Sequence, residues 1–281
     1  MKNWIRSGRP GPVVCISTGI HGNERAPVTA MHRLAQQLSS EDIVAGSLLL
    51  VLGNPKALEQ DRRQTLGGVD LNRCFTDAIL RHPPRHHEHA RAQELARAVE
   101  GVDVLVDFHC TVEPGGRFIM HHPDDERHQQ VAALLDAPVV LSDPSLLFGG
   151  CSFDEHLSTQ GRVGLCYETG WIGDPACDPG RILDEMRSLL RGLGMLSGEP
   201  VRVSGQRRLV LTDRLCCPES GFHWADGIGE NLQSLSAGEL LGHSRAGTPL
   251  LLSGAATLIF PKKHPELLRP GQPLVYLAAD A

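Results

Sequence analysis

The stretch VVCISTGIHGNERAPVTAMHRLAQQL, residues 13–38, contains the pattern that most clearly predicts the fold class. Residues 13–17 form a short apolar run, which is typical of a buried strand. Between Pro27 and Leu38 the apolar residues recur at helical spacing, so this part predicts a helix. A buried strand that leads directly into an amphipathic helix is the building unit of an α/β protein.

The same alternation continues to about residue 198. Further apolar runs predict strands at residues 47–52, 102–108, 139–141 and 163–167. Helical patterns lie at residues 88–99, 129–135, 153–159 and 181–193. Near-continuous apolar strands between helices predict a mainly parallel sheet that helices cover on both faces. After residue 198, short extended runs separated by Gly and Pro predict a small all-β domain. We therefore expect an α/β domain over residues 1–198 and a β-rich domain over residues 199–281.

The composition argues against several classes of function. The net charge is −6 with Lys and Arg scattered along the chain, so a nucleic-acid partner is not expected. Seven Phe, three Trp and two Tyr supply little material for stacking on bases or sugars. No run approaches the roughly 18 apolar residues of a membrane span, so no membrane partner is expected either. Eight cysteines, none in C-x-x-C spacing, predict free thiols in a cytoplasmic protein.

Polar residues gather where the predicted strands end, which is where ligands bind in doubly wound sheets. His21 and Glu24 follow the first strand as H-x-x-E, framed by Gly19 and Gly22, and His109 follows the third strand. Two His and one carboxylate leave a fourth position open, as in a catalytic zinc site that holds a water. The alternative is a solvated His and a Glu that the helix dipole favours. That alternative leaves the glycine-framed His21 unexplained.

Glu168 follows the apolar strand at residues 163–167. Beside a metal-bound water it could act as general base and then as general acid, and the alternative is a paired structural charge. A loop with several cations and an amide lies at residues 61–73 and carries Arg62, Arg63, Asn72 and Arg73. Guanidinium groups donate in pairs to a planar carboxylate, whereas the alternative is a solvated surface loop.

The remaining histidines and cysteines give weaker signals. RHPPRHHEHAR, residues 81–91, contains four histidines but lacks the spacing H-E-x-x-H. We expect a solvated loop and helix start there rather than a second metal site. Cys110 beside His109 could be a nucleophile with the His as its base. Adjacent residues on an extended segment point in opposite directions, which argues against that pair.

Five motifs follow one another along the first 170 residues: H-G-N-E at 21–24, N-P at 54–55 with Arg63 nine residues on, D-L-N-R at 70–73, D-F-H at 107–109 and Y-E-T-G at 167–170. This ordered set resembles the aspartoacylase/succinylglutamate desuccinylase family. That family consists of zinc amidohydrolases built on the metallocarboxypeptidase fold. A β domain follows its catalytic domain, so the resemblance covers most of the chain.

The resemblance implies a zinc centre and its catalytic partner. His21, Glu24 and His109 would bind one zinc ion. Glu168 would serve as general base and acid. The expected reaction is attack of a Glu-activated, zinc-bound water on an amide carbonyl.

The resemblance also implies roles for the loop at residues 61–73. Arg63 would polarise the scissile carbonyl and stabilise the oxyanion, and its offset from the N-P motif favours it over Arg62. Asn72 and Arg73 would hold the substrate carboxylate. Asp70 would contact a zinc-bound His without binding the metal itself, and so would orient its imidazole.

Two features depart from the family pattern. The loop between Arg63 and Asp70 is longer than expected, and the helix at 153–159 lacks the Tyr and Arg that aspartoacylase carries there. His156 is the one candidate replacement, with an exposed helix residue as its alternative interpretation. We expect a zinc-dependent enzyme that deacylates an N-acyl amino acid or a related small carboxylate-bearing amide, and a homo-oligomer is compatible with the sequence. The alternatives are a metallocarboxypeptidase and a non-catalytic metal-containing binding protein.

Overall fold

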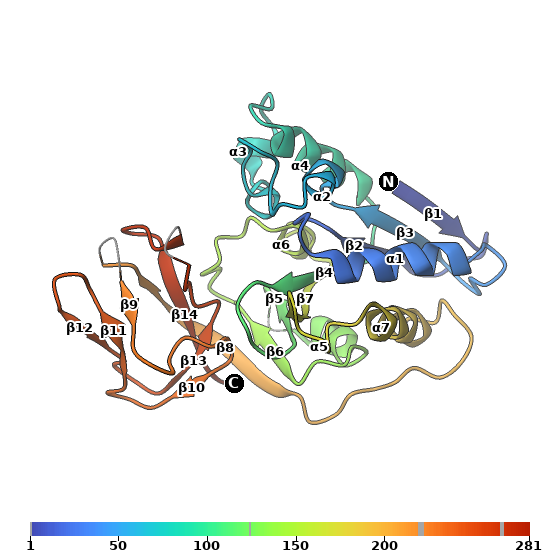
Figure 1. Ribbon diagram of the computed structural model, residues 1–281. Coiled ribbons are helices and arrows are strands. Elements are labelled where there is room, and N and C mark those ends of the chain that lie inside the picture. Colours follow the sequence, from blue (N-terminus) through green and yellow to red (C-terminus); the bar gives the residue numbers. More distant parts are fainter. Residues whose placement is uncertain (1, 124, 219–221, 265–266) are drawn as a thin grey trace.

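The computed structural model describes residues 2–123, 125–218, 222–264 and 267–281. Within these residues, eleven strands form one sheet in the order β1-β3-β2-β4-β7-β5-β6-β8-β14-β13-β10 (Figure 1). Its strands are β1 (Lys2–Arg6), β2 (Val13–Thr18), β3 (Ser47–Leu52), β4 (Val104–Thr111), β5 (Phe118–His121), β6 (Val139–Ser142), β7 (Val163–Trp171), β8 (Arg207–Cys216), β10 (Ser234–Leu235), β13 (Ala256–Ile259) and β14 (Pro273–Asp280).

A smaller sheet and the helices complete the described part of the chain. The strands β9 (His223–Trp224), β11 (Leu240–His243) and β12 (Pro249–Leu251) pair in the order β12-β11-β9. The helices are α1 (Arg25–Gln37), α2 (Pro55–Glu59), α3 (Asp77–Leu80), α4 (His87–Ala98), α5 (Glu126–Ala132), α6 (Phe153–Ser158) and α7 (Pro179–Gly192), with a 3₁₀ turn η1 (Leu71–Arg73). No helix of these described ranges is long and apolar enough to cross a membrane.

Helices cover both faces of the central strands, and the alternation of strand side chains decides which face each residue serves. On β2, Val14 and Ile16 belong to the same apolar cluster as residues of α1 and α7. Their neighbour Cys15 belongs to a second cluster with residues of α4 and α6. The α/β class predicted from the strand–helix alternation is therefore confirmed.

The sheet as a whole is mixed, but most strand pairings within residues 1–198 are parallel, as expected. β2, β3, β4 and β7 run parallel, but β1 pairs antiparallel with β3 and β5 pairs antiparallel with β7. Short connections explain both reversals. Only residues 7–12 join β1 to β2, and only residues 112–117 join β4 to β5. A parallel crossover needs a dozen or more residues, so such short links can only reverse the chain.

The C-terminal strands extend the large sheet. β8 pairs in parallel with β6, and β14, β13 and β10 then follow in antiparallel order (Figure 1). Leu258 belongs to an apolar cluster formed within this C-terminal part, whereas Tyr276 shares a cluster with Phe118 of β5 and Leu141 of β6. Residues 207–280 thus carry strands where the sequence predicts them, yet their backbone is continuous with the first sheet. A domain boundary at residue 198 stays a prediction.

Local capping moves some helix ends away from the expected positions. The helix predicted at 129–135 runs instead from Glu126 to Ala132. The Asp125 carboxylate accepts a hydrogen bond from the backbone N–H of His128, which satisfies a free donor of the first turn. An N-cap of this kind starts the helix three residues earlier than the apolar spacing indicates.

Candidate active site

The first two predicted metal ligands lie in the turn between β2 and α1. His21 follows β2, and Glu24 is the N-cap residue of α1. Gly22 lies against α2 so closely that a Cβ on it would be 2.1 Å from the carbonyl carbon of Ala57. The turn can pack this tightly only with glycine at that position. The glycine frame seen in the sequence thus brings His21 and Glu24 to one end of the sheet.

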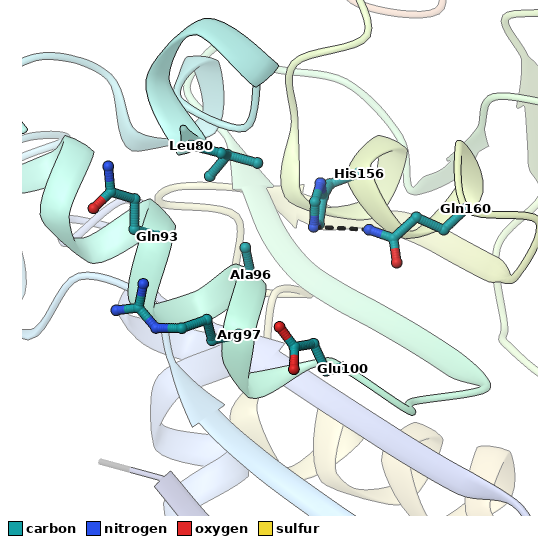
Figure 2. A pocket seen from close by; sticks show the side chains of 7 residues that line it. All are labelled: Leu80, Gln93, Ala96, Arg97, Glu100, His156 and Gln160. Atoms are coloured by element: carbon teal, nitrogen blue, oxygen red, sulfur yellow. Dashed lines mark hydrogen bonds between the residues drawn. The ribbon is translucent and has the colours of Figure 1, made fainter. Parts of the chain in front are cut away.

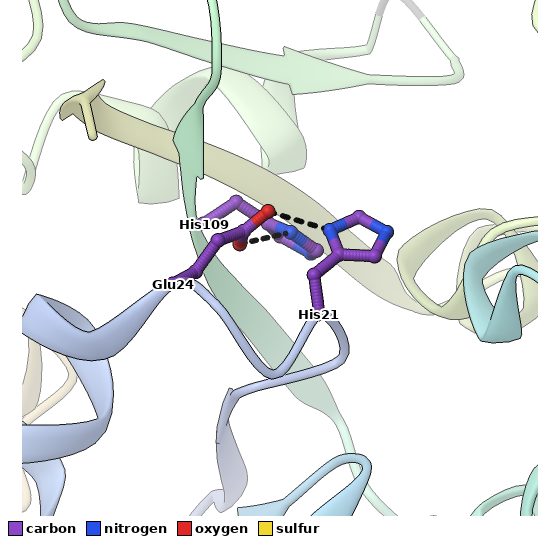
Figure 3. A group of neighbouring side chains, drawn as sticks. All are labelled: His21, Glu24 and His109. Carbon is purple, nitrogen blue, oxygen red and sulfur yellow. Dashed lines mark hydrogen bonds and ion pairs between the residues drawn. The ribbon is translucent and has the colours of Figure 1, made fainter. Parts of the chain in front are cut away.

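The side chains of His21, Glu24 and His109 meet at one point (Figure 3). Oε1 of Glu24 lies 2.6 Å from Nδ1 of His21, and Oε2 of Glu24 lies 3.0 Å from Nδ1 of His109. One potential ligand atom from each residue lies within 4.8 Å of the other two, and all three residues are buried. Two imidazole nitrogens and a carboxylate can therefore reach a single cation.

Each imidazole has a carboxylate next to its Nε2 atom. Nε2 of His21 lies 3.2 Å from Oδ1 of Asp70, and Nε2 of His109 lies 2.8 Å from Oδ2 of Asp107. A His whose second nitrogen faces a carboxylate is held in one tautomer and orientation, an arrangement common behind bound metals. Asp70 is predicted from the sequence to orient a zinc-bound His, whereas Asp107 has no predicted role. The signal for Asp107 was its spacing, because residues i and i+2 of a strand share a face.

The charged groups around His21, Glu24 and His109 interact favourably. Burial opposes the charge of Glu24, but the neighbouring His21 and His109 lower the pKa of Glu24 overall. Burial also opposes the charge of His109, but Asp107 and Glu24 raise the pKa of that imidazole. The group therefore consists of an ionised carboxylate between two imidazoles.

Glu168 lies inside β7 and is the register partner of His109 on the parallel neighbour β4. The expectation that both residues follow their strands is wrong in detail, because each strand continues two or three residues further. Glu168 is 7% exposed, and its Oε2 has no hydrogen-bond partner among the described residues. Burial raises the pKa of Glu168 to about 8; His109 and Arg63 lower it, and Glu24 adds to the rise. A buried, unpartnered carboxyl of raised pKa is a typical proton-transfer group.

The loop between α2 and η1 brings Arg63 to this group. Nε and Nη2 of Arg63 donate to Oδ2 of Asp70 at 3.2 and 2.8 Å, and Asp70 in turn contacts His21. Arg62 is exposed, and its backbone N–H donates to Ala57. Of the two neighbouring arginines, Arg63 is thus the one that this network includes.

Asn72 and Arg73 lie in η1, directly after Asp70. Oδ1 of Asn72 accepts a hydrogen bond from the backbone N–H of Phe153 at the start of α6. That contact leaves the amide NH₂ of Asn72 as its donor for a ligand. Nη1 of Arg73 donates to the backbone carbonyl of Asn72, and the neighbouring Asp70 raises the pKa of Arg73.

Several other histidines lie away from this group. His82, His86 and His87 are exposed, as expected for a solvated segment. His156 lines a separate surface pocket of about 220 Å³ between α3, α4 and α6, where Nε2 of His156 accepts a hydrogen bond from Gln160 (Figure 2). None of the residues named as ligands or catalytic groups lines that pocket. His156 therefore does not replace the missing Tyr and Arg at the ligand group.

The described cysteines are free thiols, as predicted. Sγ of Cys110 lies 3.3 Å from Sγ of Cys177 and 3.6 Å from Oγ1 of Thr169. The His109 imidazole instead contacts Glu24 and lies on the other side of β4. Cys110 and His109 therefore do not form a nucleophile–base pair.

Comparison with known proteins places these residues in a family. The family model of the succinylglutamate desuccinylase/aspartoacylase catalytic domain matches residues 10–170, more than half of the chain. A succinylglutamate desuccinylase of Serratia proteamaculans is 36% identical over 37% of this chain and 32% of its own length. An N-alpha-acetyl-L-2,4-diaminobutyric acid deacetylase of Halomonas elongata is 25% identical over 75% of this chain and 63% of its own. The chain thus spans less than two thirds of these curated relatives.

Solved structures share the fold. A succinylglutamate desuccinylase/aspartoacylase of Rhodobacter sphaeroides matches with a TM-score of 0.77 at 20% identity, over 97% of this chain and 87% of that one. A product-bound ectoine utilization protein of Ruegeria pomeroyi matches with a TM-score of 0.74 at 20% identity, over 99% and 88%. The family match includes the segments that carry His21, Glu24, Arg63, His109 and Glu168. The chain belongs to the succinylglutamate desuccinylase/aspartoacylase family.

Proposed function

We propose that this chain is a zinc-dependent amidohydrolase that removes an acyl group from an N-acyl amino acid or a related small carboxylate-bearing amide. The proposal includes a metallocarboxypeptidase-like catalytic domain over residues 1–198 and a β-rich domain over residues 199–281. The observation that carries it is the position of Glu168, buried and without a partner at Oε2, directly across from His109. The relatives named as desuccinylase and deacetylase support the choice of an N-acyl amino acid.

The residues present suit a zinc ion. Two imidazoles and one carboxylate converge from the β2–α1 turn and from β4, and this donor set is typical of catalytic zinc. The Asp70 and Asp107 carboxylates occupy the second nitrogen of each imidazole, which leaves the two Nδ1 atoms for the metal. When bound, zinc supplies Lewis-acid activation of water and of the amide carbonyl. We assign His21, Glu24 and His109 as its ligands.

The proton transfers fall to Glu168. As the water oxygen bonds to the carbonyl carbon, the Glu168 carboxylate takes a proton from that water. The same proton then passes to the nitrogen as the C–N bond breaks, and the products are a carboxylic acid and an amine. Burial raises the pKa of Glu168, and a carboxyl whose pKa is raised in this way can take up a proton and return it, which suits the double role.

Arg63 and the η1 residues hold the substrate. The ion pair with Asp70 uses Nε and Nη2 of Arg63, so Nη1 is left to donate to the carbonyl oxygen as negative charge develops on it. Arg73 and the amide of Asn72 are assigned to the carboxylate of the substrate, for which a guanidinium is well suited.

The reaction itself is tested with a substrate panel. We expect the zinc-loaded protein to release free amine from at least one N-acetyl, N-succinyl or N-formyl amino acid, and to leave short peptides intact. Amine release is measured with a fluorogenic amine reagent, and the Glu168→Gln variant purified in parallel controls for contaminating activity. Release of C-terminal residues from peptides would support a metallocarboxypeptidase instead. Zinc binding without any hydrolysis would indicate a non-catalytic binding protein.

Arg63→Ala is expected to lower kcat by about 10²–10³-fold, because it removes a donor to the developing oxyanion. The matched control is Arg62→Ala at the neighbouring exposed position, which should change kcat little. Steady-state kinetics on the best panel substrate measure both variants. A large loss in Arg62→Ala together with near-normal Arg63→Ala would reverse the assignment of the two arginines.

A further inference from the structure

The histidine-rich segment at residues 81–91 contains a buried acid. Glu88 lies in the first turn of α4 and is fully buried, whereas its neighbour His87 is exposed. Among the described residues, no ion pair includes Glu88. Burying a carboxylate without a cation is costly, and its position at a helix N-terminus offsets only part of that cost. The arrangement therefore needs an explanation beyond the stability of α4.

The Glu88 carboxylate accepts hydrogen bonds from both ends of one short loop. Oε1 accepts from the backbone N–H of Thr65 at 3.0 Å and from its hydroxyl at 2.6 Å. Oε2 accepts from the backbone N–H of Val69 at 3.4 Å. The side-chain amide of Asn54 adds a weak contact to Oε1 at 3.4 Å. Although burial opposes the charge, the hydrogen bonds from the loop lower the pKa of Glu88 overall.

The loop packs directly onto this carboxylate. A Cβ on Gly68 would lie 2.4 Å from Oε2 of Glu88 and 2.4 Å from Oγ1 of Thr65, so the contact leaves no room for a side chain. The backbone N–H of Gly68 also donates to the carbonyl of Thr65, which closes the loop as a turn. The segment 65–69 is thus held from inside by a residue 19 or more positions further along the chain.

The two ends of the held segment adjoin residues of the candidate site. Thr65 is two residues after Arg63, and Val69 directly precedes Asp70. Arg63 and Asp70 form the ion pair that contacts His21. Movement of the segment would shift this ion pair, and a displacement of 1 Å at a reacting group can cost a large factor in rate.

We propose that Glu88 is a positioning residue whose buried carboxylate holds the loop at residues 65–69, and through it Arg63, at the site. The kinetic part rests on the proposed hydrolysis, but the hold on the loop does not. Two variants separate the hydrogen bonds from the charge. Glu88→Ala leaves the donors of Thr65 without a partner, whereas Glu88→Gln keeps an acceptor oxygen for them.

The first test is hydrogen exchange, which does not depend on activity. Glu88→Ala should increase the rate of amide exchange in residues 61–70 much more than in α4. Glu88→Gln should stay close to wild type, and so should Glu100→Ala, an exposed acid just beyond the same helix. Unchanged exchange in residues 61–70 of Glu88→Ala would overturn the proposal. If Glu88→Ala does not fold, Thr65→Val removes only the hydroxyl donor and should show the same change at smaller size.

The second test is a double-mutant cycle with Arg63. Glu88→Ala alone should lower kcat by up to about 10²-fold with KM changed only a few-fold, and Glu88→Gln should recover most of it. If Glu88 acts through Arg63, adding Glu88→Ala to Arg63→Ala should cost little more. Losses that multiply instead would show a general structural role and overturn the proposal. A wild-type protein without hydrolysis would contradict the proposed function alone, because hydrogen exchange still decides whether Glu88 holds the loop.

Discussion

Glu168→Gln should lower kcat for amide hydrolysis by about 10²–10⁴-fold while the protein still binds zinc. The substitution keeps the size of the side chain in its buried position on β7 but removes its ability to take up and return a proton. KM should change little, because Glu168 is not assigned to the substrate carboxylate. Steady-state kinetics together with metal analysis of the same preparation measure both quantities.

Glu185 supplies a matched control for that experiment. It is also a buried glutamate with a raised pKa and an unpartnered Oε2, but it lies on α7 and pairs with Arg181. Glu185→Gln should retain kcat within a few-fold. Equal losses in both variants would show that any change of a buried glutamate damages the fold, and normal activity of Glu168→Gln would remove Glu168 from the mechanism.

His21→Ala should abolish tight zinc binding and with it hydrolysis, because two donors cannot hold the ion as three do. Protein purified without chelator should contain about one zinc per chain in the wild type and far less in the variant. The substitution also removes the partner of Oε1 of Glu24, whereas Oδ1 of Asp70 still accepts a hydrogen bond from the backbone N–H of Asn72. Thermal unfolding with and without zinc therefore accompanies the metal analysis, and the wild type alone should gain stability from the ion.

His86→Ala is the control for the metal analysis. His86 is exposed and belongs to the histidine-rich segment outside the ligand group, so its loss should leave zinc content and kcat unchanged. Full zinc in both variants would show that the ligand assignment is wrong. Loss of zinc in His86→Ala alone would place the metal in the segment at residues 81–91.

Local patterns in the sequence predict much of the fold. The strand and helix at residues 13–38 appear as β2 and α1 within a few residues of their expected bounds. Apolar spacing reports such elements because it reflects burial of one face of one segment. Apolar spacing did not predict the antiparallel direction of β1 and β5 or the pairing of β6 with β8. Strand pairing joins residues far apart in the chain, and no local spacing encodes it.

Short motifs in the sequence predict the chemical groups of the candidate site. His21 and Glu24 are predicted from H-x-x-E in a glycine-framed turn, and His109 and Glu168 from their positions near the ends of apolar strands. Such predictions are possible because a short motif contains both the residue types and their spacing. The residues that contact those groups become visible only in the folded chain. Asp107 contacts Nε2 of His109. Glu88, which lies in the histidine-rich segment at residues 81–91, accepts a hydrogen bond from Thr65 in the loop that follows Arg63. Such partners depend on which faces meet when β4, α4 and the loop pack together, and packing is a property of the whole chain.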